Sequence, residues 1–299
     1  MNILVTGATG FIGQPLTIRL IAEGHQVTAW VRDLPKAEST LHQQVKCVTQ
    51  PAQLSDVEFD AVINLAGAPI ADKRWTSARK LLLRSSRIDL THELVAHLKK
   101  QSVPPKIMIS GSAIGYYGSQ INDDELDENG HFEPGFTHRL CADWEAAALT
   151  LESDSTRVCL LRTGVVLGLG GGALGKMLTP FKLGLGGPIG NGKQVMSWIH
   201  LQDWINAAMF LLDNEDCSGA YNFVSPEPVT NKIFTSQLAD AVNRPAFFKV
   251  PCFVLQIAMG EAAELLCEGQ RVIPKKLSDA GFEFKFSNIR NAFSNIVAD

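Results

Sequence analysis

Residues 2–13 read NILVTGATGFIG, and this stretch decides the fold. Its short apolar run, 2–6, is typical of a buried strand. The turn that follows has the pattern T-G-x-x-G-x-x-G, and apolar residues with helical spacing continue over 11–23 until Gly24. Glycines at these three places allow a tight turn, a close backbone approach to a pyrophosphate, and close packing of helix on strand. The spacing therefore predicts a dinucleotide-binding loop with the helix N-terminus facing the phosphates.

Strand and helix patterns alternate through the first half of the chain. Short apolar runs predict strands, and helical spacing predicts helices, over the strand ranges 25–31, 45–48, 60–65, 106–110 and 157–162 and the helix ranges 76–100 and 136–151. Alternation of this kind gives βαβ units with right-handed crossovers. We therefore expect an α/β protein with a Rossmann-type, doubly wound parallel sheet.

The pattern changes after residue 163, where glycine becomes dense over 168–192. Glycine at that density indicates loops whose backbone approaches another group closely. We expect a dinucleotide-binding domain over 1–165, to which 195–228 return. The remaining segments, 166–194 and 229–299, are expected to form a smaller C-terminal substrate lobe.

The composition narrows the class of protein. The chain has 299 residues, 45% hydrophobic and 19% charged, with a formal net charge of -4, which fits a globular protein and argues against disorder and nucleic-acid binding. No apolar run approaches the ~18 residues of a membrane span, and no signal peptide is recognisable. Six dispersed cysteines without ligand spacing predict reduced, mostly buried thiols, no metal site and a cytoplasmic protein. Monomer and homodimer both stay open.

Arg32 bears on which dinucleotide is bound. A protein that binds NAD(H) usually places an acidic residue at the end of the second strand, for the ribose 2′-hydroxyl. Here Arg32 stands at that exit, and a guanidinium can pair with a 2′-phosphate through two hydrogen bonds. NADP(H) is therefore favoured, while Asp33 leaves NAD(H) as the weaker alternative.

Further motifs resemble a known group of proteins. The glycine loop, NLAG at 64–67 and WIHLQDW at 198–204 resemble an extended short-chain dehydrogenase/reductase. More specific motifs are similar to its atypical subgroup, the epimerase family proteins: R-x-x-x-T at 87–91, GSAIGYYG at 111–118, C-x-x-W-E at 141–145, LRTGVVL at 161–167, FKLGLGGPIGNGKQ at 181–194 and GQRVIPKKL at 269–277. The match runs nearly from end to end.

The resemblance implies a Rossmann-type fold, NADP(H) as cofactor and a set of cofactor-binding positions. These are the phosphate loop, the 2′-phosphate site, the exit of the strand at 60–65, the long helix, the residues near the nicotinamide ribose and the end of the strand at 157–162. In that order the positions are Gly7, Thr9, Gly10, Phe11, Ile12 and Gly13; Arg32; Leu65, Ala66 and Gly67; Arg87; Ser110 and Gly111; Arg162 and Thr163.

One expected feature is missing from the sequence. Typical members use a Tyr-x-x-x-Lys pair as acid and base, since an isolated tyrosine titrates at about 10. None of the three tyrosines of this chain is followed by lysine four residues later. Alignment on Glu145 puts Thr137 at the tyrosine position and Cys141 at the lysine position. The remaining candidates for the catalytic role are Ser112, Tyr116 and Tyr117, which follow one predicted strand.

Two functions follow from these observations. The first is an NADP(H)-dependent oxidoreductase, or an enzyme like a nucleotide-sugar epimerase, with a non-standard acid/base and a small substrate, for which an anionic group is one option. The second is a non-catalytic NADP(H)-binding redox sensor or a regulatory protein that binds a partner. A large apolar patch on the C-terminal lobe would favour the second function.

Overall fold

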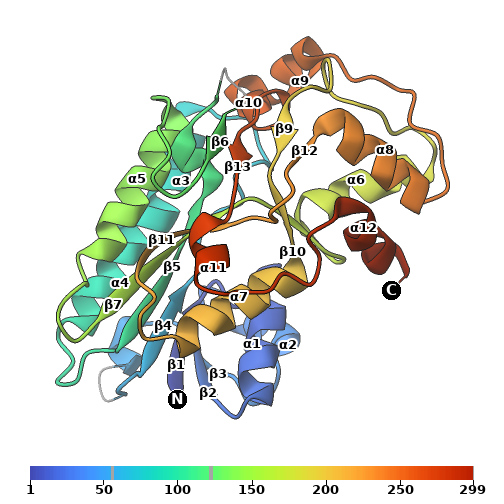
Figure 1. Cartoon of the computed structure of the whole chain (residues 1–299). Coiled ribbons are helices and arrows are strands. Elements are labelled where there is room, and N and C mark those ends of the chain that lie inside the picture. The colour runs from blue at the N-terminus through green and yellow to red at the C-terminus, as the bar shows by residue number, and fades with distance from the viewer. Residues whose placement is uncertain (55–56, 121–123, 299) are drawn as a thin grey trace.

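The computed structural model describes residues 1–54, 57–120 and 124–298 and is built around one large sheet (Figure 1). All neighbouring strands of that sheet are parallel. Their spatial order is β11 (Gly219–Phe223), β7 (Arg157–Thr163), β5 (Ile107–Ala113), β4 (Ala61–Asn64), β1 (Asn2–Thr6), β2 (Gln26–Trp30) and β3 (Lys46–Val48). The prediction of a doubly wound Rossmann-type sheet is confirmed.

Helices cover both faces of this sheet because successive side chains of each strand point to opposite sides. Ile3 and Val5 of β1 belong to one buried cluster and Leu4 to another. The first cluster includes side chains of α1 (Gly13–Ala22), α2 (Leu34–Thr40) and α7 (Leu201–Asp213). The second includes side chains of α4 (Leu90–Leu98) and α5 (Phe136–Leu149). Both faces of the strands are therefore dry, which explains their continuous apolar runs.

The helix expected over 76–100 is interrupted. It begins as α3 (Ser77–Arg84), where the Thr76 hydroxyl accepts a hydrogen bond from the Arg79 amide at 3.2 Å. A π-helical turn, Ser85–Asp89, then leads into α4 without a break in direction. Turns of this kind are rare and concentrate at functional sites.

The C-terminal lobe has a hydrophobic core of its own, whose members could not be predicted from the spacing of apolar residues. Apolar side chains of α6 (Gly172–Lys182), α8 (Asn231–Ala241) and α12 (Ile289–Ala298) form this cluster. Short strand pairs tie the lobe together: β10 (Trp198–His200) pairs with β8 (Val165–Leu167), and β12 (Val229–Thr230) pairs with β9 (Val195–Met196).

The segment before the last helix returns to the large sheet. Strand β13 (Arg271–Val272) pairs with β6 (Glu125–Leu126), and helix α11 (Lys275–Asp279) packs against β11. Leu277 belongs to the core of the large sheet, although the expected division places 229–299 in the lobe. Burial of this leucine requires the C-terminal segment to cross back over the sheet edge.

The cysteines differ in part from expectation. Cys141, Cys159 and Cys217 are free and buried, but Cys252 and Cys267 form a disulfide whose Cα atoms lie 5.9 Å apart. The prediction of six reduced thiols is therefore wrong for these two. They lie in α9 (Cys252–Met259) and α10 (Glu264–Cys267), which the chain folds beside one another.

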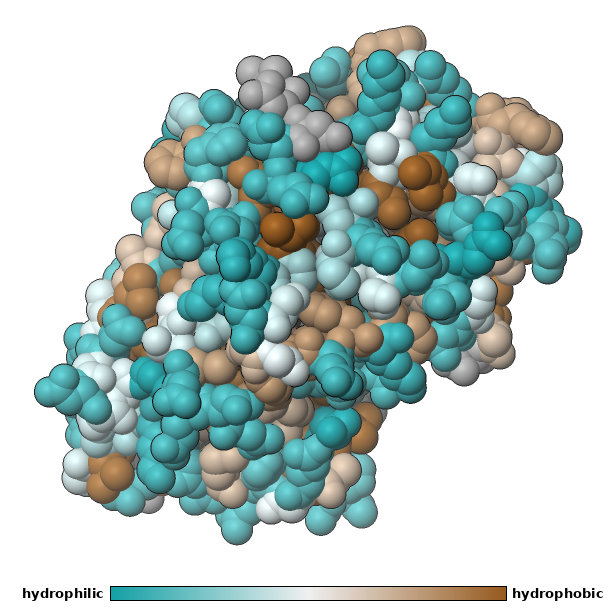
Figure 2. All heavy atoms as spheres, viewed as in Figure 1, coloured by the Kyte–Doolittle hydropathy of each residue, from teal (hydrophilic) through white to brown (hydrophobic). Residues whose placement is uncertain are grey.

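The surface facing the reader in Figure 2 is mainly hydrophilic, with apolar residues in several separate patches. Among the described residues, no helix is long and apolar enough to pass through a lipid bilayer.

Candidate functional site

The glycine loop between β1 and α1 has no room for a side chain at Gly7 or at Gly13. A Cβ atom on Gly7, whose φ is +71°, would lie 2.7 Å from the carbonyl carbon of Leu65, and one on Gly13 would lie 2.3 Å from the Gly7 carbonyl oxygen. The Gly10 amide closes the turn by donating to the same carbonyl at 2.9 Å. Helix α1 begins at Gly13 with no side-chain cap and no acidic residue in its first turn. None of the described side chains therefore competes with an anion for its N-terminal amides.

Phe11 closes the far side of this loop. A Cβ atom on Gly171 would lie 2.7 Å from the Phe11 ring, and one on Gly172 would lie 2.9 Å from it. Thr9 and Ile12 are half-buried beside it, and the Thr9 carbonyl accepts from the Gln14 side chain at 3.1 Å. Glycines of the 168–192 segment thus let a loop of the C-terminal half lie directly on the dinucleotide loop.

Arg32 and Asp33 differ in what they contact at the exit of β2. The Asp33 carboxylate caps α2, accepting from the Lys36 amide at 3.0 Å. The Arg32 side chain is exposed and, among the described residues, makes no hydrogen bond or ion pair. The acidic side chain at this exit is therefore already engaged, whereas the basic one is available.

A buried polar network joins the exits of β1, β4 and β5. Thr6 Oγ1 donates to Asn64 Oδ1 at 2.7 Å and accepts from the Ala66 amide at 3.2 Å. Asn64 Nδ2 donates to Thr91 Oγ1 at 2.9 Å and to Ser110 Oγ at 3.2 Å. These bonds fix Leu65, Ala66 and Gly67 beside the glycine loop. Sequence reasoning missed Thr6, Asn64 and Thr91, although the asparagine of NLAG was a visible signal.

Ser112, at the end of β5, is bound to a buried ion pair. Its hydroxyl donates to Glu145 Oε1 at 2.6 Å. Arg162 donates to both oxygens of the same carboxylate, from Nε at 2.9 Å and from Nη2 at 3.0 Å. Burial disfavours the charged guanidinium, but its hydrogen bonds and attraction to Glu145 outweigh this effect and raise the pKa of Arg162. Both carboxylate oxygens are thus engaged within the protein.

The two neighbouring tyrosines have different environments. Tyr117 is fully buried, and its hydroxyl donates to Asn222 Oδ1 at 2.7 Å, contacts the Asp127 carbonyl at 2.9 Å and accepts from Arg162 Nη1 at 3.1 Å. Burial raises its pKa to about 12 against the opposing charge of Arg162. Tyr116 is half-buried, and the Arg162 guanidinium lies 3.4 Å from its ring centroid. The Tyr116 hydroxyl makes no hydrogen bond to the described residues.

Helix α5 faces the same loop with Thr137 and Cys141. A Cβ atom on Gly115 would lie 3.2 Å from Thr137 Cβ and 3.5 Å from Cys141 Sγ. Burial raises the pKa of the Cys141 thiol to about 12, so this group is neutral and inert near pH 7. Gly111 permits the helix to approach, because a Cβ there would lie 2.8 Å from the Trp144 ring.

The last positions of the predicted site lie on the π-helical turn and on β7. The Arg87 guanidinium lies 5.3 Å from the Trp144 ring centroid and donates to the Leu83 carbonyl at 3.3 Å. Gly67 is its neighbour, since a Cβ there would lie 2.9 Å from Arg87 Cζ. Thr163 instead accepts from Trp204 Nε1 at 3.1 Å, which ties β7 to α7.

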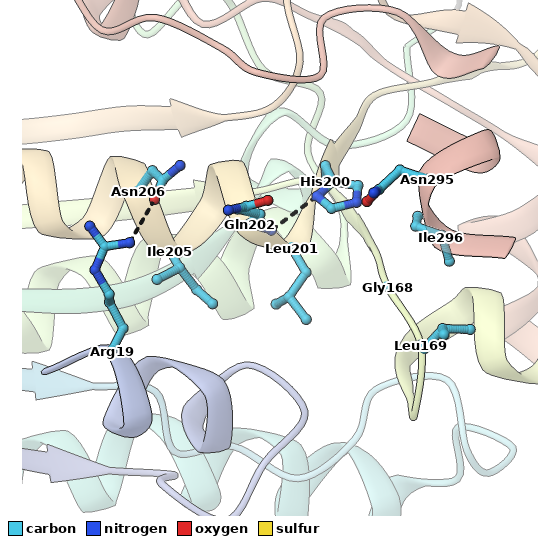
Figure 3. A pocket seen from close by; sticks show the side chains of 10 residues that line it. All are labelled: Arg19, Gly168, Leu169, His200, Leu201, Gln202, Ile205, Asn206, Asn295 and Ile296. Atoms are coloured by element: carbon cyan, nitrogen blue, oxygen red, sulfur yellow. Dashed lines mark hydrogen bonds between the residues drawn. The ribbon is translucent and has the colours of Figure 1, made fainter. Parts of the chain in front are cut away.

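A pocket of about 410 Å³ lies beside α7, and a Cβ atom on Gly168 in its lining would lie 3.2 Å from the Phe11 ring (Figure 3). It opens between Arg19 of α1, Asn206 of α7 and Asn295 of α12, and none of the predicted site residues lines it. His200 borders it, and its Nδ1 accepts from the Gln202 amide at 3.1 Å as the cap of α7. No cluster among the described residues has the ligand set of a metal site.

Comparison with known proteins agrees with this architecture. The model of the NAD dependent epimerase/dehydratase family matches residues 3–223, and that of a domain of unknown function, DUF1731, matches residues 250–296. Epimerase family protein Mb2239 of Mycobacterium bovis is 41% identical over 97% of this chain and 95% of its own length. Epimerase family protein SDR39U1 of Mus musculus is 37% identical, and the match covers all of both chains.

Solved structures give the same result. The crystal structure of human epimerase family protein SDR39U1 with NADPH superposes with a TM-score of 0.91 at 36% identity, covering all of both chains. A UDP-galactose 4-epimerase, at 16% identity and a TM-score of 0.76 over 100% of this chain and 98% of its own, shares the fold. The resemblance inferred from the motifs is confirmed, and this chain belongs to the NAD dependent epimerase/dehydratase family, with the C-terminal region that the epimerase family proteins of the SDR39U1 type share.

Proposed function

We propose that the chain binds NADP(H) across the carboxyl ends of β1, β2, β4 and β5 and acts as an atypical oxidoreductase or epimerase. The observation that carries this proposal is the glycine loop, in which Gly7 and Gly13 exclude even a Cβ atom. A loop closed to side chains beside an uncapped helix N-terminus fits a diphosphate. The human relative was crystallised with NADPH, which supports this choice of cofactor.

The residues proposed to hold the cofactor divide among its parts. The loop would bind the diphosphate, and Arg32 would bind the 2′-phosphate, because Asp33 is engaged as a helix cap. The exits of β4 and β5 would line the two riboses. The full set is Gly7, Thr9, Gly10, Phe11, Ile12, Gly13, Arg32, Leu65, Ala66, Gly67, Arg87, Ser110, Gly111, Arg162 and Thr163.

A bound nicotinamide would supply hydride exchange, and the chain must supply the proton transfer. We propose Tyr116 for this role. Ser112 Oγ is bound to Glu145, and the Tyr117 hydroxyl is buried with three partners. Tyr116 is the candidate whose hydroxyl has no partner among the described residues, and the Arg162 guanidinium lies 3.4 Å from its ring centroid.

The test is a fluorescence titration with NADPH and NADH. Loss of a two-point, charge-assisted contact in Arg32→Ala should weaken NADPH binding by about 10- to 100-fold. NADH binding should stay unchanged. Lys106→Ala is the matched control, because it removes an exposed cation just before β5, at the amino ends of the parallel strands. Failure of wild type to bind either nucleotide would overturn the proposal.

The catalytic part needs its own test. Wild type and Tyr116→Phe would be assayed with NADPH against carbonyl compounds and nucleotide sugars. Turnover lost in Tyr116→Phe, with unchanged NADPH affinity, supports the assignment. Equal turnover in both would refute it.

One observation favours the alternative of a partner-binding, non-catalytic protein. Helix α9 has no buried residue, and Phe253 and Ile257 are 61% and 71% exposed; Phe247, in the loop before α9, is 80% exposed. This apolar surface on the C-terminal lobe is the feature a binding partner would cover. Tight NADPH binding without turnover against every substrate, together with co-purification of a partner lost in Phe247→Ser and Ile257→Ser, would favour that function.

A further inference from the structure

Four cations on the helical run 77–98 divide into two pairs. Lys80 forms an ion pair with Glu261, and Arg84 forms one with Asp143 at 2.6 Å. Arg79 and Arg87 have no carboxylate within ion-pairing distance among the described residues. A charged side chain on a helix usually faces solvent or an acid, whereas these two arginines are half-buried and have no acid beside them.

Both unpaired arginines face the segment that follows β4. Arg79 Nη2 donates to the Pro69 carbonyl. The position of a Cβ on Gly67 lies 3.1 Å from Arg87 Nη2 and 3.2 Å from Nε. The two residues are eight apart, which is about two helical turns, and the π-helical turn lies between α3 and α4 at Arg87 itself. Both guanidinium groups therefore lie beside the 67–69 segment.

Their surroundings are unfavourable for positive charge in the free protein. Burial lowers the pKa of Arg87, and the neighbouring charge of Arg79 lowers it further. Arg79 Nε is buried with no hydrogen-bond partner among the described residues. The contact of Arg87 with Trp144 and its one bond to a carbonyl offset only part of the desolvation. Two like charges brought together without an acid form an arrangement that an anion would stabilise.

We propose that Arg79 and Arg87 form a receptor for a phosphoryl or carboxylate anion beside Gly67. The inference rests on the proposed function for the position of the cofactor relative to this receptor. Arg87 contacts the Trp144 ring on α5, the helix that carries Cys141 at the lysine position of typical members. The receptor thus places a positive charge beside the helix from which that lysine is missing. The anion has two possible sources, the cofactor diphosphate and an anionic substrate.

The test uses inorganic pyrophosphate as the probe, read out by thermal unfolding and calorimetry. Arg87→Met keeps an apolar stem against Trp144 and removes the charge. It should weaken pyrophosphate binding by about 10- to 100-fold. The unfolding midpoint of the ligand-free variant should rise by about 2 °C, because an unpaired buried cation is gone. Arg84→Met is the matched control, since it removes the same charge one turn away and should leave pyrophosphate binding unchanged.

The outcomes separate the receptor from a structural arginine and from the proposed function. Unchanged pyrophosphate binding in Arg87→Met, or a lowered unfolding midpoint, would overturn the receptor. When pyrophosphate binding depends on Arg87, a repeat at saturating NADPH identifies the source. If saturating NADPH prevents pyrophosphate binding, the anion belongs to the cofactor. If pyrophosphate still binds, the anion belongs to a substrate. Pyrophosphate needs no nicotinamide, so failure of NADPH to bind would refute the proposed function and leave this result intact.

Discussion

Removal of one partner of the Glu145–Arg162 ion pair should destabilise the protein strongly. The Glu145 and Arg162 side chains are each 6% exposed. Arg162→Met would leave the carboxylate with the Ser112 hydroxyl as its one side-chain donor and would also deprive Tyr117 and the Glu128 carbonyl of a donor. A buried charge stripped of its partner costs about 3–5 kcal/mol. With an unfolding entropy of about 2.1 cal/mol/K per residue, this is a fall of roughly 5–8 °C in the unfolding midpoint.

The assay is calorimetric and urea-induced unfolding of a double-mutant cycle. Arg162→Met combined with Glu145→Met should be more stable than Arg162→Met alone, because no uncompensated charge remains. The exposed Arg84–Asp143 pair is the matched control. Its side chains are 43% and 46% exposed, so its removal should cost under about 1 kcal/mol. A loss below about 1 kcal/mol in Arg162→Met, or a double variant no more stable than it, would refute the reasoning.

Other variants and titrations test separate parts of the site. Gly13→Ala should abolish NADPH binding, because its Cβ would lie 2.3 Å from a loop carbonyl oxygen. Gly175→Ala has no atom within 4 Å of its Cβ, so the free energy of unfolding should be unchanged or higher by about 0.5–1 kcal/mol. Calorimetry of both variants checks this, and equal NADPH affinity in the two would contradict it. Absorbance near 295 nm should show that Tyr117 ionises at about pH 12. The folded state then holds this proton between about pH 10 and 12, so stability should fall as pH rises through that window, and less so in Tyr117→Phe. The thiols of Cys141 and Cys159, with pKa values raised by burial to about 12 and about 11, should resist a thiol reagent at about pH 8 until the protein is unfolded; fast labelling of the native protein would contradict their burial.

Local signals account for the part of the fold that the sequence could predict. The run 2–13 contains its strand, turn and helix within one short segment, and each is recognisable by spacing alone. The structure begins α1 at Gly13 rather than at residue 11, although Ile12 already has helical dihedral angles and the Gln14 amide donates to the Gly10 carbonyl at 3.0 Å. Element boundaries depend on such local geometry, which periodicity does not encode.

Long-range partners account for what could not be predicted. Glu145 and Arg162 meet because α5 lies against β7, and their spacing in the chain carries no sign of that contact. The sequence also carries no sign of which cations of the helical run 77–98 form ion pairs. Lys80, for example, pairs with Glu261, which comes from the C-terminal lobe. The motif at 269–277 entered only as part of the resemblance, and the structure gives Gln270 a contact: its side chain donates to the Gly118 carbonyl at 2.6 Å, just after the two tyrosines.

The position of β11 has a consequence for synthesis on the ribosome. Strand β7 pairs with β5 on one side, but its other edge stays unpaired until β11 is synthesised, roughly 55 residues later. At about 5–20 residues per second, the nascent chain carries an open, apolar parallel edge for several seconds. Such an edge is a template for pairing with another chain. The nascent protein should therefore depend most on a chaperone when many ribosomes translate the same message, or when translation stalls between β7 and β11.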